Sequence, residues 1–238
     1  MNLQRLNDCL YEAVADLQLV EGKTSLNVKT ASLPKARRYV QNLLSREGRL
    51  INKEYPNFDE HYTKLQKKCR QSKGIPRIEM PVIRSFNVDA FKTRLRRGEL
   101  DIVKPYAKGK LYTPTNLNKK TGKEWLVLGL KDGNLKDDII KVNVTKTPVK
   151  DLIPTQSDIW LDKLIGTKSD IQKFKGKRLA PVIVSKEGYI LDGHHRFGKK
   201  MLMSPGIKMK ILRLPLGIDL LLKIGRSYGN AMGSKQQR

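Results

Sequence analysis

The sequence predicts an α+β fold, in which a basic, mainly helical N-terminal extension precedes a C-terminal domain built on a small mixed sheet with flanking helices. Apolar residues recur at helical spacing through much of the first 75 residues, as in Leu3, Leu6 and Leu10. From residue 148 onward, short apolar runs alternate with helical stretches. A hydrophobic fraction of 39% over 238 residues is enough to form a substantial core.

The N-terminal segment, residues 1–75, is expected to form three helices. The first covers residues 3–20, where the apolar residues keep a helical period. The second, residues 33–48, begins where Ser32 precedes a Leu-Pro pair, which is a typical helix start. The third, residues 58–72, is very basic.

Residues 76–147 are assigned to a connecting region rich in strands and loops. Its prolines and glycines interrupt any long helical pattern. The expected elements are a strand over 78–83, a basic helix over 88–97, loop over 104–123, and strands over 124–130 and 139–149.

The C-terminal domain, residues 148–229, is followed by a tail over 230–238 that is expected to fray. Its helix after a Pro-Thr turn is predicted to begin at Thr155 or Ser157. The remaining predictions are a hairpin around Glu187-Gly188, a helix from His194 to about Met203, a strand over 208–215 and a closing helix over 218–229.

The charge balance is strongly positive. The chain has 48 Lys and Arg residues against 23 Asp and Glu residues, which gives a net charge of +25. Such a surplus attracts polyanions, so we expect a nucleic-acid partner, with DNA favoured. The basic residues gather in four clusters, at 35–38, 64–73, 92–97 and 173–178. No apolar stretch approaches the roughly 20 residues that span a bilayer, so no membrane partner is expected.

The two cysteines, Cys9 and Cys69, lie far apart and no Cys/His cluster accompanies them. A structural zinc site is therefore not expected. The N-terminus carries acidic residues within its apolar periodicity and does not read as a signal peptide, so we expect a cytoplasmic protein with reduced thiols.

Two of the three histidines lie in the stretch YILDGHHRFGKK, where Asp192, Gly193, His194, His195 and Arg196 follow a predicted strand and open a predicted helix. A helix N-terminus offers free N–H groups to an anion, and a glycine there allows close backbone approach. Arginine and imidazole side chains can add hydrogen bonds to a phosphate. A capped turn with surface histidines explains the same residues equally well.

The surrounding pattern favours the phosphate site over the capped turn. A Pro-containing turn, a helix, the strand PVIV, a Gly hairpin and the DGHHR turn follow one another in residues 145–215, which resemble the ParB/sulfiredoxin superfamily. Members of that fold bind nucleotide phosphates at this turn. The chain has neither the cysteine of sulfiredoxins nor the Glu-Arg-Arg of CTP-binding partition proteins, and it looks most like the DGHHR branch that transfers phosphate, or like relatives called ParB-like nucleases.

The resemblance implies a role for each matching residue. Gly193, His194, His195 and Arg196 would hold the phosphates of a nucleoside triphosphate, ATP or CTP, and Asp192 would bind Mg²⁺ or orient a histidine. Catalysis would rest on the two histidines, Asp192 and a general base. The facing turn would bring nucleotide contacts from Gln156 and Ser157, and the helix that follows it would carry the candidates for the base, Asp158 and Asp162.

The ordinary alternatives are structural. Asp158 would favour a helix N-terminus, and Asp162 would pair with nearby lysines. His61 is expected at the surface, and Trp125 and Trp160 in the core. The function that follows is nucleotide binding with phosphotransfer or hydrolysis on or near nucleic acid, with a non-catalytic DNA-binding module or a ParB-like nuclease as alternatives.

Overall fold

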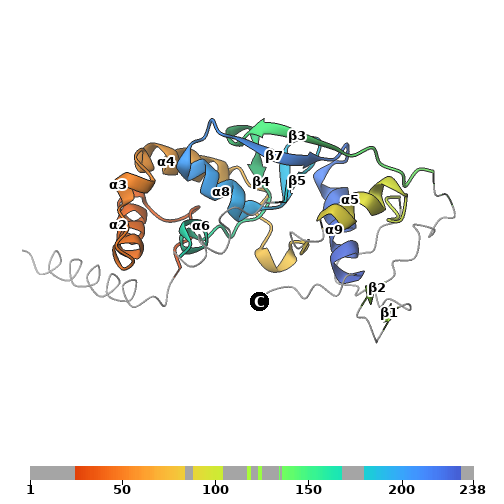
Figure 1. Ribbon diagram of the computed structural model, residues 1–238, viewed down its shortest axis with the longest axis horizontal. Helices are drawn as coiled ribbons and strands as arrows, with labels where there is room; N and C mark the ends of the chain where they lie inside the picture. The colour runs from red at the N-terminus through yellow and green to blue at the C-terminus, as the bar shows by residue number, and fades with distance from the viewer. Residues whose placement is uncertain are drawn as a thin grey trace, which may run out of the picture.

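The computed structural model describes residues 25–83, 88–103, 117–118, 123–124, 134, 136–167 and 180–231. Within these ranges the chain is α+β, as predicted, with seven α-helices around a five-stranded mixed sheet (Figure 1). The helices are α2 (Leu33–Ser45), α3 (Ile51–Glu54), α4 (Phe58–Arg70), α5 (Val88–Arg96), α6 (Leu161–Ile165), α8 (His194–Met203) and α9 (Ile218–Ala231). The strands are β1 (Leu117–Asn118), β2 (Lys123–Glu124), β3 (Asn143–Pro148), β4 (Ile153–Pro154), β5 (Val182–Val184), β6 (Tyr189–Asp192) and β7 (Lys208–Arg213).

The main sheet has the order β3-β7-β5-β6-β4. The pairs β3–β7 and β5–β6 are antiparallel, whereas β7–β5 and β6–β4 are parallel. The predicted hairpin is confirmed: β5 and β6 are joined by a turn in which the Gly188 N–H donates to the Ser185 carbonyl at 3.1 Å. Gly188 has a φ of 92°, a conformation that favours glycine. Strands β1 and β2 form a separate antiparallel pair.

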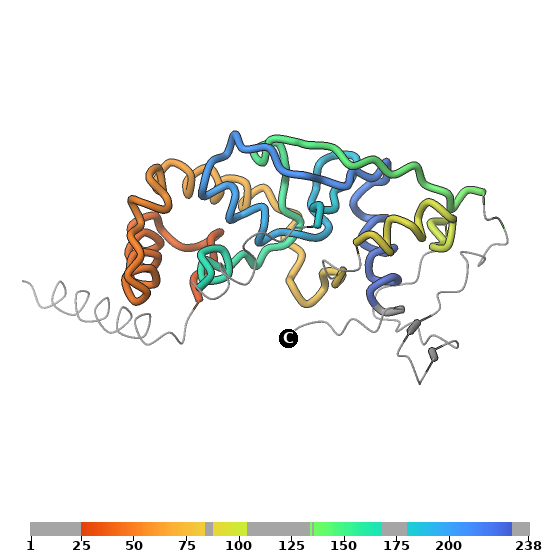
Figure 2. The backbone as a smooth tube through the Cα atoms, viewed as in Figure 1, coloured from red at the N-terminus to blue at the C-terminus, as the bar shows by residue number. Residues whose placement is uncertain are grey.

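The sheet has a core on each side, and because successive side chains of a strand point to opposite faces, the central strand β5 contributes to both. Val182 and Val184 of β5 belong to a core shared with α2, α4, α6 and α8. Ile183, between them, belongs to a second core shared with α5 and α9. In Figures 1 and 2 the helices α2 to α4 gather at one end of the molecule and α5 with α9 at the other.

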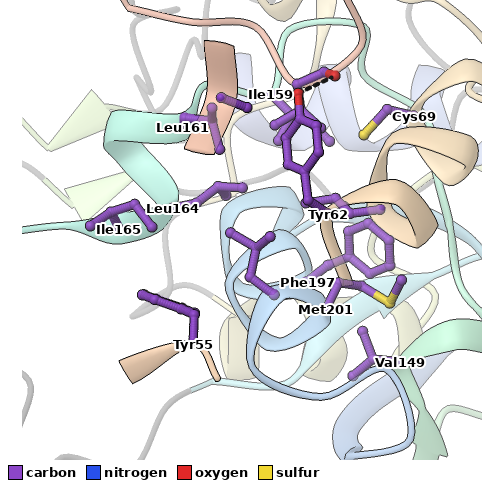
Figure 3. Packing of buried hydrophobic residues seen from close by; sticks show 14 of the residues in the cluster. Tyr55, Tyr62, Cys69, Val149, Ile159, Leu161, Leu164, Ile165, Phe197 and Met201 are labelled. Carbon is purple, nitrogen blue, oxygen red and sulfur yellow. Dashed lines mark hydrogen bonds between the residues drawn. The ribbon is translucent and has the colours of Figure 1, made fainter. Parts of the chain in front are cut away.

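The first core joins the N-terminal helices to the C-terminal strands (Figure 3). Tyr62 of α4 is fully buried, and its hydroxyl donates to the carbonyls of Val28 and Ala31 at 3.2 and 2.8 Å. Phe197 and Met201 of α8 pack into the same cluster. Residues 28–69 and 149–211 therefore bury their apolar surface in one core. The sheet thus packs on helices from a distant part of the chain, such as α2.

Most of the other expected elements are confirmed. The helices predicted over 33–48, 58–72, 88–97, 194–203 and 218–229 correspond to α2, α4, α5, α8 and α9, and the strands over 139–149 and 208–215 contain β3 and β7. The helix over 3–20, Trp125 and most of the strand over 124–130 lie outside the described residues.

Two local predictions were wrong. Residues 78–83 do not form a strand: Arg77–Glu79 is a 3₁₀ turn, because Pro76 and Pro81 on either side cannot donate to a sheet. The helix after β4 starts at neither Thr155 nor Ser157 but at Leu161. Residues 155–157 are held extended by Ile75, whose N–H donates to the Thr155 carbonyl at 3.2 Å and whose carbonyl accepts from the Ser157 N–H at 2.9 Å.

His61 was predicted at the surface and is instead buried, with 7% of its surface exposed. Its Nδ1 lies 2.9 Å from the Leu202 carbonyl at the end of α8. The error arises because the apolar face of α4 is covered by α8, which follows much later in the chain. Trp160 is half-buried and forms an isolated antiparallel bridge with Asn27.

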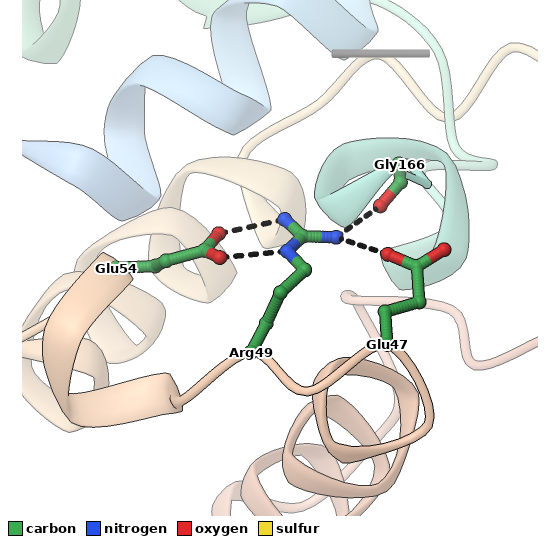
Figure 4. A network of polar contacts seen from close by, with 4 residues as sticks. All are labelled: Glu47, Arg49, Glu54 and Gly166. Carbon is green, nitrogen blue, oxygen red and sulfur yellow. Dashed lines mark hydrogen bonds and ion pairs between the residues drawn. The ribbon is translucent and has the colours of Figure 1, made fainter. Parts of the chain in front are cut away.

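A buried arginine ties the loop after α2 to α6 (Figure 4). The Arg49 side chain is 6% exposed. Its Nε and Nη2 each donate at 2.6 Å to the two carboxylate oxygens of Glu54, while Nη1 donates to Glu47 at 2.9 Å and to the Gly166 carbonyl at 2.8 Å. These bonds, first of all those to Glu54, raise the pKa of Arg49 further above its ordinary value. The guanidinium thus fixes the C-terminal end of α6.

Replacing Arg49 with lysine is expected to lower the free energy of unfolding by about 2 kcal/mol, because an ammonium cannot reproduce the planar, forked set of donors. Urea unfolding measures the change. Arg37→Lys is the matched control, since Arg37 is 38% exposed and its ion pair with Asp59 lies at the surface. The control should lose less than about 1 kcal/mol, and an equal loss in the two variants would contradict a special role for Arg49.

Candidate phosphate-binding site

The DGHHR turn lies where β6 ends and α8 begins, as the sequence predicts. Gly193 is the N-cap residue of α8 and has a φ of 103°, in the left-handed region. A Cβ at this position would lie 2.7 Å from Val182 Cγ2 and 2.9 Å from Arg196 Nη2. The turn therefore requires glycine for its conformation and for space.

The N-terminus of α8 has no side-chain cap. The first intrahelical bond is donated by the Phe197 N–H to the Gly193 carbonyl at 2.9 Å. The N–H groups of the preceding residues in the first turn have no acceptor within the helix, and the helix dipole adds partial positive charge there. The end of α8 is thus able to receive an anion.

His194 is a structural acceptor in this site. It is 5% exposed, and its Nε2 accepts hydrogen bonds from the backbone N–H groups of Thr155 and Gln156 at 3.1 and 3.2 Å. These bonds require the neutral ring with its proton on Nδ1. Burial, helped by the charges of His195 and Arg196, lowers the pKa of His194 to about 3. His194 therefore joins the 155–156 backbone to α8, and its Nε2 has no lone pair left for a substrate.

His195 keeps one ring nitrogen uncommitted. Its Nε2 is buried and has no hydrogen-bond partner among the described residues. Burial lowers the pKa of His195 to about 4, and the positive charges of Arg77 and Lys163 act in the same direction while Asp162 opposes them. The imidazole is accordingly neutral at pH 7, and it lies within electrostatic reach of two cations and one carboxylate.

Asp192 and Arg196 form an ion pair at 2.8 Å across the turn. Arg196 Nη1 also donates to the Ala180 and Pro181 carbonyls just before β5. The guanidinium thus connects the start of β5 to the end of β6 and is directed to protein groups. Burial raises the pKa of Asp192 to about 6, although Arg196 and the Gly193 N–H act to lower it.

The facing loop is held by residues that come much earlier in the chain. Asp158 precedes α6, contrary to its predicted place on the helix, and its Oδ2 accepts from the Arg77 N–H at 2.8 Å. The Gln156 side chain donates to the Asp158 carbonyl. The Ser157 hydroxyl donates to the Ile75 carbonyl at 3.3 Å. These contacts set the shape of the loop.

Asp162 lies in the first turn of α6, and the two oxygens of its carboxylate have different environments. Oδ2 lies 3.6 Å from Lys163 Nζ, whereas Oδ1 is buried without a partner in the described part of the chain. Helices α6 and α8 approach closely, since a Cβ on Gly198 would lie 2.7 Å from Leu164 Cδ2. This packing brings Asp162 into electrostatic contact with His195.

The structure therefore brings together most of the predicted site residues, but several of them form hydrogen bonds with other groups of the protein. Three buried polar atoms of the region have no partner among the described residues: Thr155 Oγ1, Asp162 Oδ1 and His195 Nε2. Buried polar atoms are nearly always hydrogen-bonded, so an exception needs a reason such as a ligand. The sequence did not single out Arg77 and Lys163, because Arg77 comes from a distant segment and Lys163 is one lysine among many.

A metal site made by these side chains alone does not fit the geometry. The described residues contain no group of three or more His, Cys, Asp or Glu side chains suited to a metal ion, and the Asp192 carboxylate already accepts from Arg196. Binding of Mg²⁺ stays a prediction. Cys69 is a buried free thiol whose pKa is raised to about 12 by burial.

Comparisons of the chain with protein-family models, with curated proteins and with solved structures find no match. The relationship to the ParB/sulfiredoxin superfamily is thus a resemblance of motifs and their order. Among the helices that the structure describes, none combines the length and apolar character needed to cross a membrane.

Gly193→Ala is expected to lower the free energy of unfolding by about 2–4 kcal/mol. The alanine would have to adopt a left-handed backbone conformation, and its methyl group would clash with Val182. Thermal and urea unfolding test this. Gly206→Ala is the control, since a Cβ there meets nothing within 4 Å. The control should stay within about 1 kcal/mol of the parent, and a Gly193→Ala protein as stable as the control would show that the turn tolerates a side chain.

The two pKa values of His194 predict a loss of stability in acid. Its pKa is about 3 in the folded chain and 6.5 ordinarily, so the unfolded chain binds the additional proton as the pH falls below 6.5. Between pH 7 and 5 this should cost the parent about 2 kcal/mol that a His194→Gln variant, with an amide acceptor in place of the ring, does not lose. Asp192, raised to about 6, acts in the opposite direction below that pH, but equally in both proteins.

Urea unfolding of the parent and of His194→Gln, at pH 7 and at pH 5, gives the difference directly. Parallel pH profiles would show that His194 is not held neutral in the folded protein.

Proposed function

We propose that the chain binds the phosphates of a nucleoside triphosphate at the N-terminus of α8 and acts on or near nucleic acid. The proposal combines the resemblance of residues 145–215 to the ParB/sulfiredoxin superfamily with the geometry of the turn. One observation carries it: an uncapped helix N-terminus adjoins a set of buried polar atoms, His195 Nε2 and Asp162 Oδ1 among them, that lack partners in the described part of the chain.

The charges around the turn favour an anion. Arg77 and Lys163 act on His195 as positive charges that lower its pKa. A phosphate at the first turn of α8 would accept from backbone N–H groups and from these side chains, as anions do at helix N-termini. A neutral His195 with its proton on Nε2 would donate to a phosphate oxygen.

The side chains present divide the predicted catalytic residues into two groups. His194 Nε2, Asp158 Oδ2 and Asp192 Oδ2 accept hydrogen bonds from the protein. His195 and Asp162 retain an uncommitted atom each. If phosphate is transferred or hydrolysed here, we propose that His195 and Asp162 move the proton, while His194 and Arg196 maintain the shape of the turn.

A binding-only function is favoured by one specific observation. His194 and Arg196, two of the four residues assigned to the phosphate by resemblance, make bonds that any stable strand-to-helix turn would need. A non-catalytic nucleic-acid-binding module would keep these bonds and would need no nucleotide. A ParB-like nuclease would instead cleave the nucleic acid without added nucleotide.

His195→Gln and Lys163→Gln are each expected to weaken binding of nucleoside triphosphate about tenfold or more, because each removes a charged or polar contact to phosphate. Calorimetric titration with ATP, CTP and GTP in the presence of Mg²⁺ measures the affinity. Lys223→Gln is the control, since Lys223 is exposed on α9 at the other face of the sheet. Its affinity should equal that of the parent.

Hydrolysis and transfer of the terminal phosphate, and cleavage of duplex DNA, are followed in the same series. If the parent binds none of the three nucleotides, the proposed nucleotide site is refuted and the non-catalytic nucleic-acid-binding module is favoured. Cleavage of DNA without nucleotide, lost in His195→Gln, would identify a nuclease instead.

A further inference from the structure

Among the described residues, the exposed lysines of the β3–β7 pair form a charged surface that is separate from the candidate site. Lys146 lies in β3, and Lys208 and Lys210 lie in β7. All three are exposed, and they have no ion pair within the described residues. We call this surface the lysine ribbon.

The register of the two strands places these lysines on one face. Lys146 is directly opposite Lys210, and Pro148 is opposite Lys208. Directly opposite residues of an antiparallel pair share a face, and residues two apart in a strand do so as well, about 7 Å apart. The same face continues to Leu212, which is buried in the core under α5 and α9. The lysine ribbon is therefore the part of this face that the helices leave exposed.

Two like charges held opposite each other destabilise a strand pair. The described residues of β3 and β7 contain no Asp or Glu that could relieve the repulsion between Lys146 and Lys210. Among the described residues, β3 is the edge strand of the sheet, and Lys146, Lys208 and Lys210 are exposed. An external polyanion is the partner that would neutralise this arrangement.

Many side chains of the basic clusters in the sequence form ion pairs with acidic residues of the protein. Lys64 pairs with Glu60, Lys73 with Asp219 and Lys92 with Asp89. Arg94 and Arg97 both approach Glu99. The cluster at 173–178 lies outside the described residues. Among the described cations, those of the ribbon combine exposure, a fixed register and a lack of acidic neighbours in their own strands.

We infer that the lysine ribbon is the surface on which duplex DNA binds, through its phosphate backbone and without reading the base sequence. Lysines contact phosphates as point charges, and phosphate contacts position a protein on the duplex without carrying sequence information. The ribbon strands contain no aromatic residue on which a base could stack, which argues against a single strand. The inference rests on the nucleic-acid partner proposed above and assigns it a site distinct from the α8 turn.

The test compares two variants with the same change in net charge. The ribbon variant carries Lys146→Gln, Lys208→Gln and Lys210→Gln. The control variant carries Lys64→Gln, Lys67→Gln and Lys223→Gln, at exposed lysines of α4 and α9. Affinity for a 20-base-pair duplex and for a single strand of equal length is measured by fluorescence anisotropy over a series of salt concentrations.

The expected result is a salt dependence for the ribbon variant that is shallower than that of the parent by about 2–3 in the slope of log K against log salt, because about 0.9 is lost for each phosphate contact. The control variant should keep the slope of the parent. Melting temperatures should be unchanged, or raised in the ribbon variant by the loss of the Lys146–Lys210 repulsion, and a wild-type melting temperature excludes unfolding as the cause.

Equal slopes for the two variants and the parent would overturn the assignment of the ribbon while leaving the nucleic-acid partner intact. Equal reductions in both variants would show that only total charge matters, and would also overturn it. Tighter binding of the single strand, sensitive to the ribbon lysines, would refute the duplex. Failure of the parent to bind either nucleic acid at low salt would instead refute the proposed partner itself.

Discussion

The unprotonated Nε2 of His194 accepts hydrogen bonds from the backbone N–H groups of Thr155 and Gln156, and the candidate site depends on this contact. It joins the first residue of α8 to the loop that follows β4. A protonated ring could not accept these bonds, and two buried N–H groups would lose their partner, at a cost of about 1–3 kcal/mol for each. The low pKa of His194 and the position of the loop are therefore two aspects of one contact.

The loop is in turn held from the other side by the segment around Ile75 and Arg77. Helix α6 is fixed by Arg49, which reaches its C-terminal end from the loop after α2, and by close packing of Leu164 against Gly198 of α8. The positions of Asp162 and His195 thus depend on contacts between three separate parts of the chain. A change in the N-terminal helices is expected to disturb the site through these contacts, without touching a ligand.

Charge has two different uses in this protein. Many basic side chains stabilise the fold by pairing with acidic residues or with carbonyl groups, as Arg49 and Arg196 do. The remaining surplus, visible in the net charge of +25, attracts anions from solution. The two proposed anion sites differ in kind. The α8 turn presents few, largely buried donors that suit a compact phosphate, whereas the lysine ribbon presents exposed charges that suit a polyanion.

Local patterns were enough to predict most of the elements and the place of the turn. The helical spacing of apolar residues in α2, α4 and α9, the Gly188 hairpin and the glycine before α8 are properties of neighbouring residues, and each has a physical cause that acts over a few positions. For the same reason the sequence indicated that Asp192, Gly193, His194, His195 and Arg196 lie together at a strand-to-helix junction.

Tertiary structure alone decided what those side chains do. Whether His194 contacts a phosphate or the Thr155 N–H, and whether Arg196 contacts a phosphate or the Ala180 carbonyl, depends on strands that pair across long stretches of chain. The burial of His61, the loop that replaces a helix start at Ser157 and the opposition of Lys146 to Lys210 arise in the same way. Hydrogen bonding and charge act at a few ångströms, and only the folded chain determines which distant residues come that close.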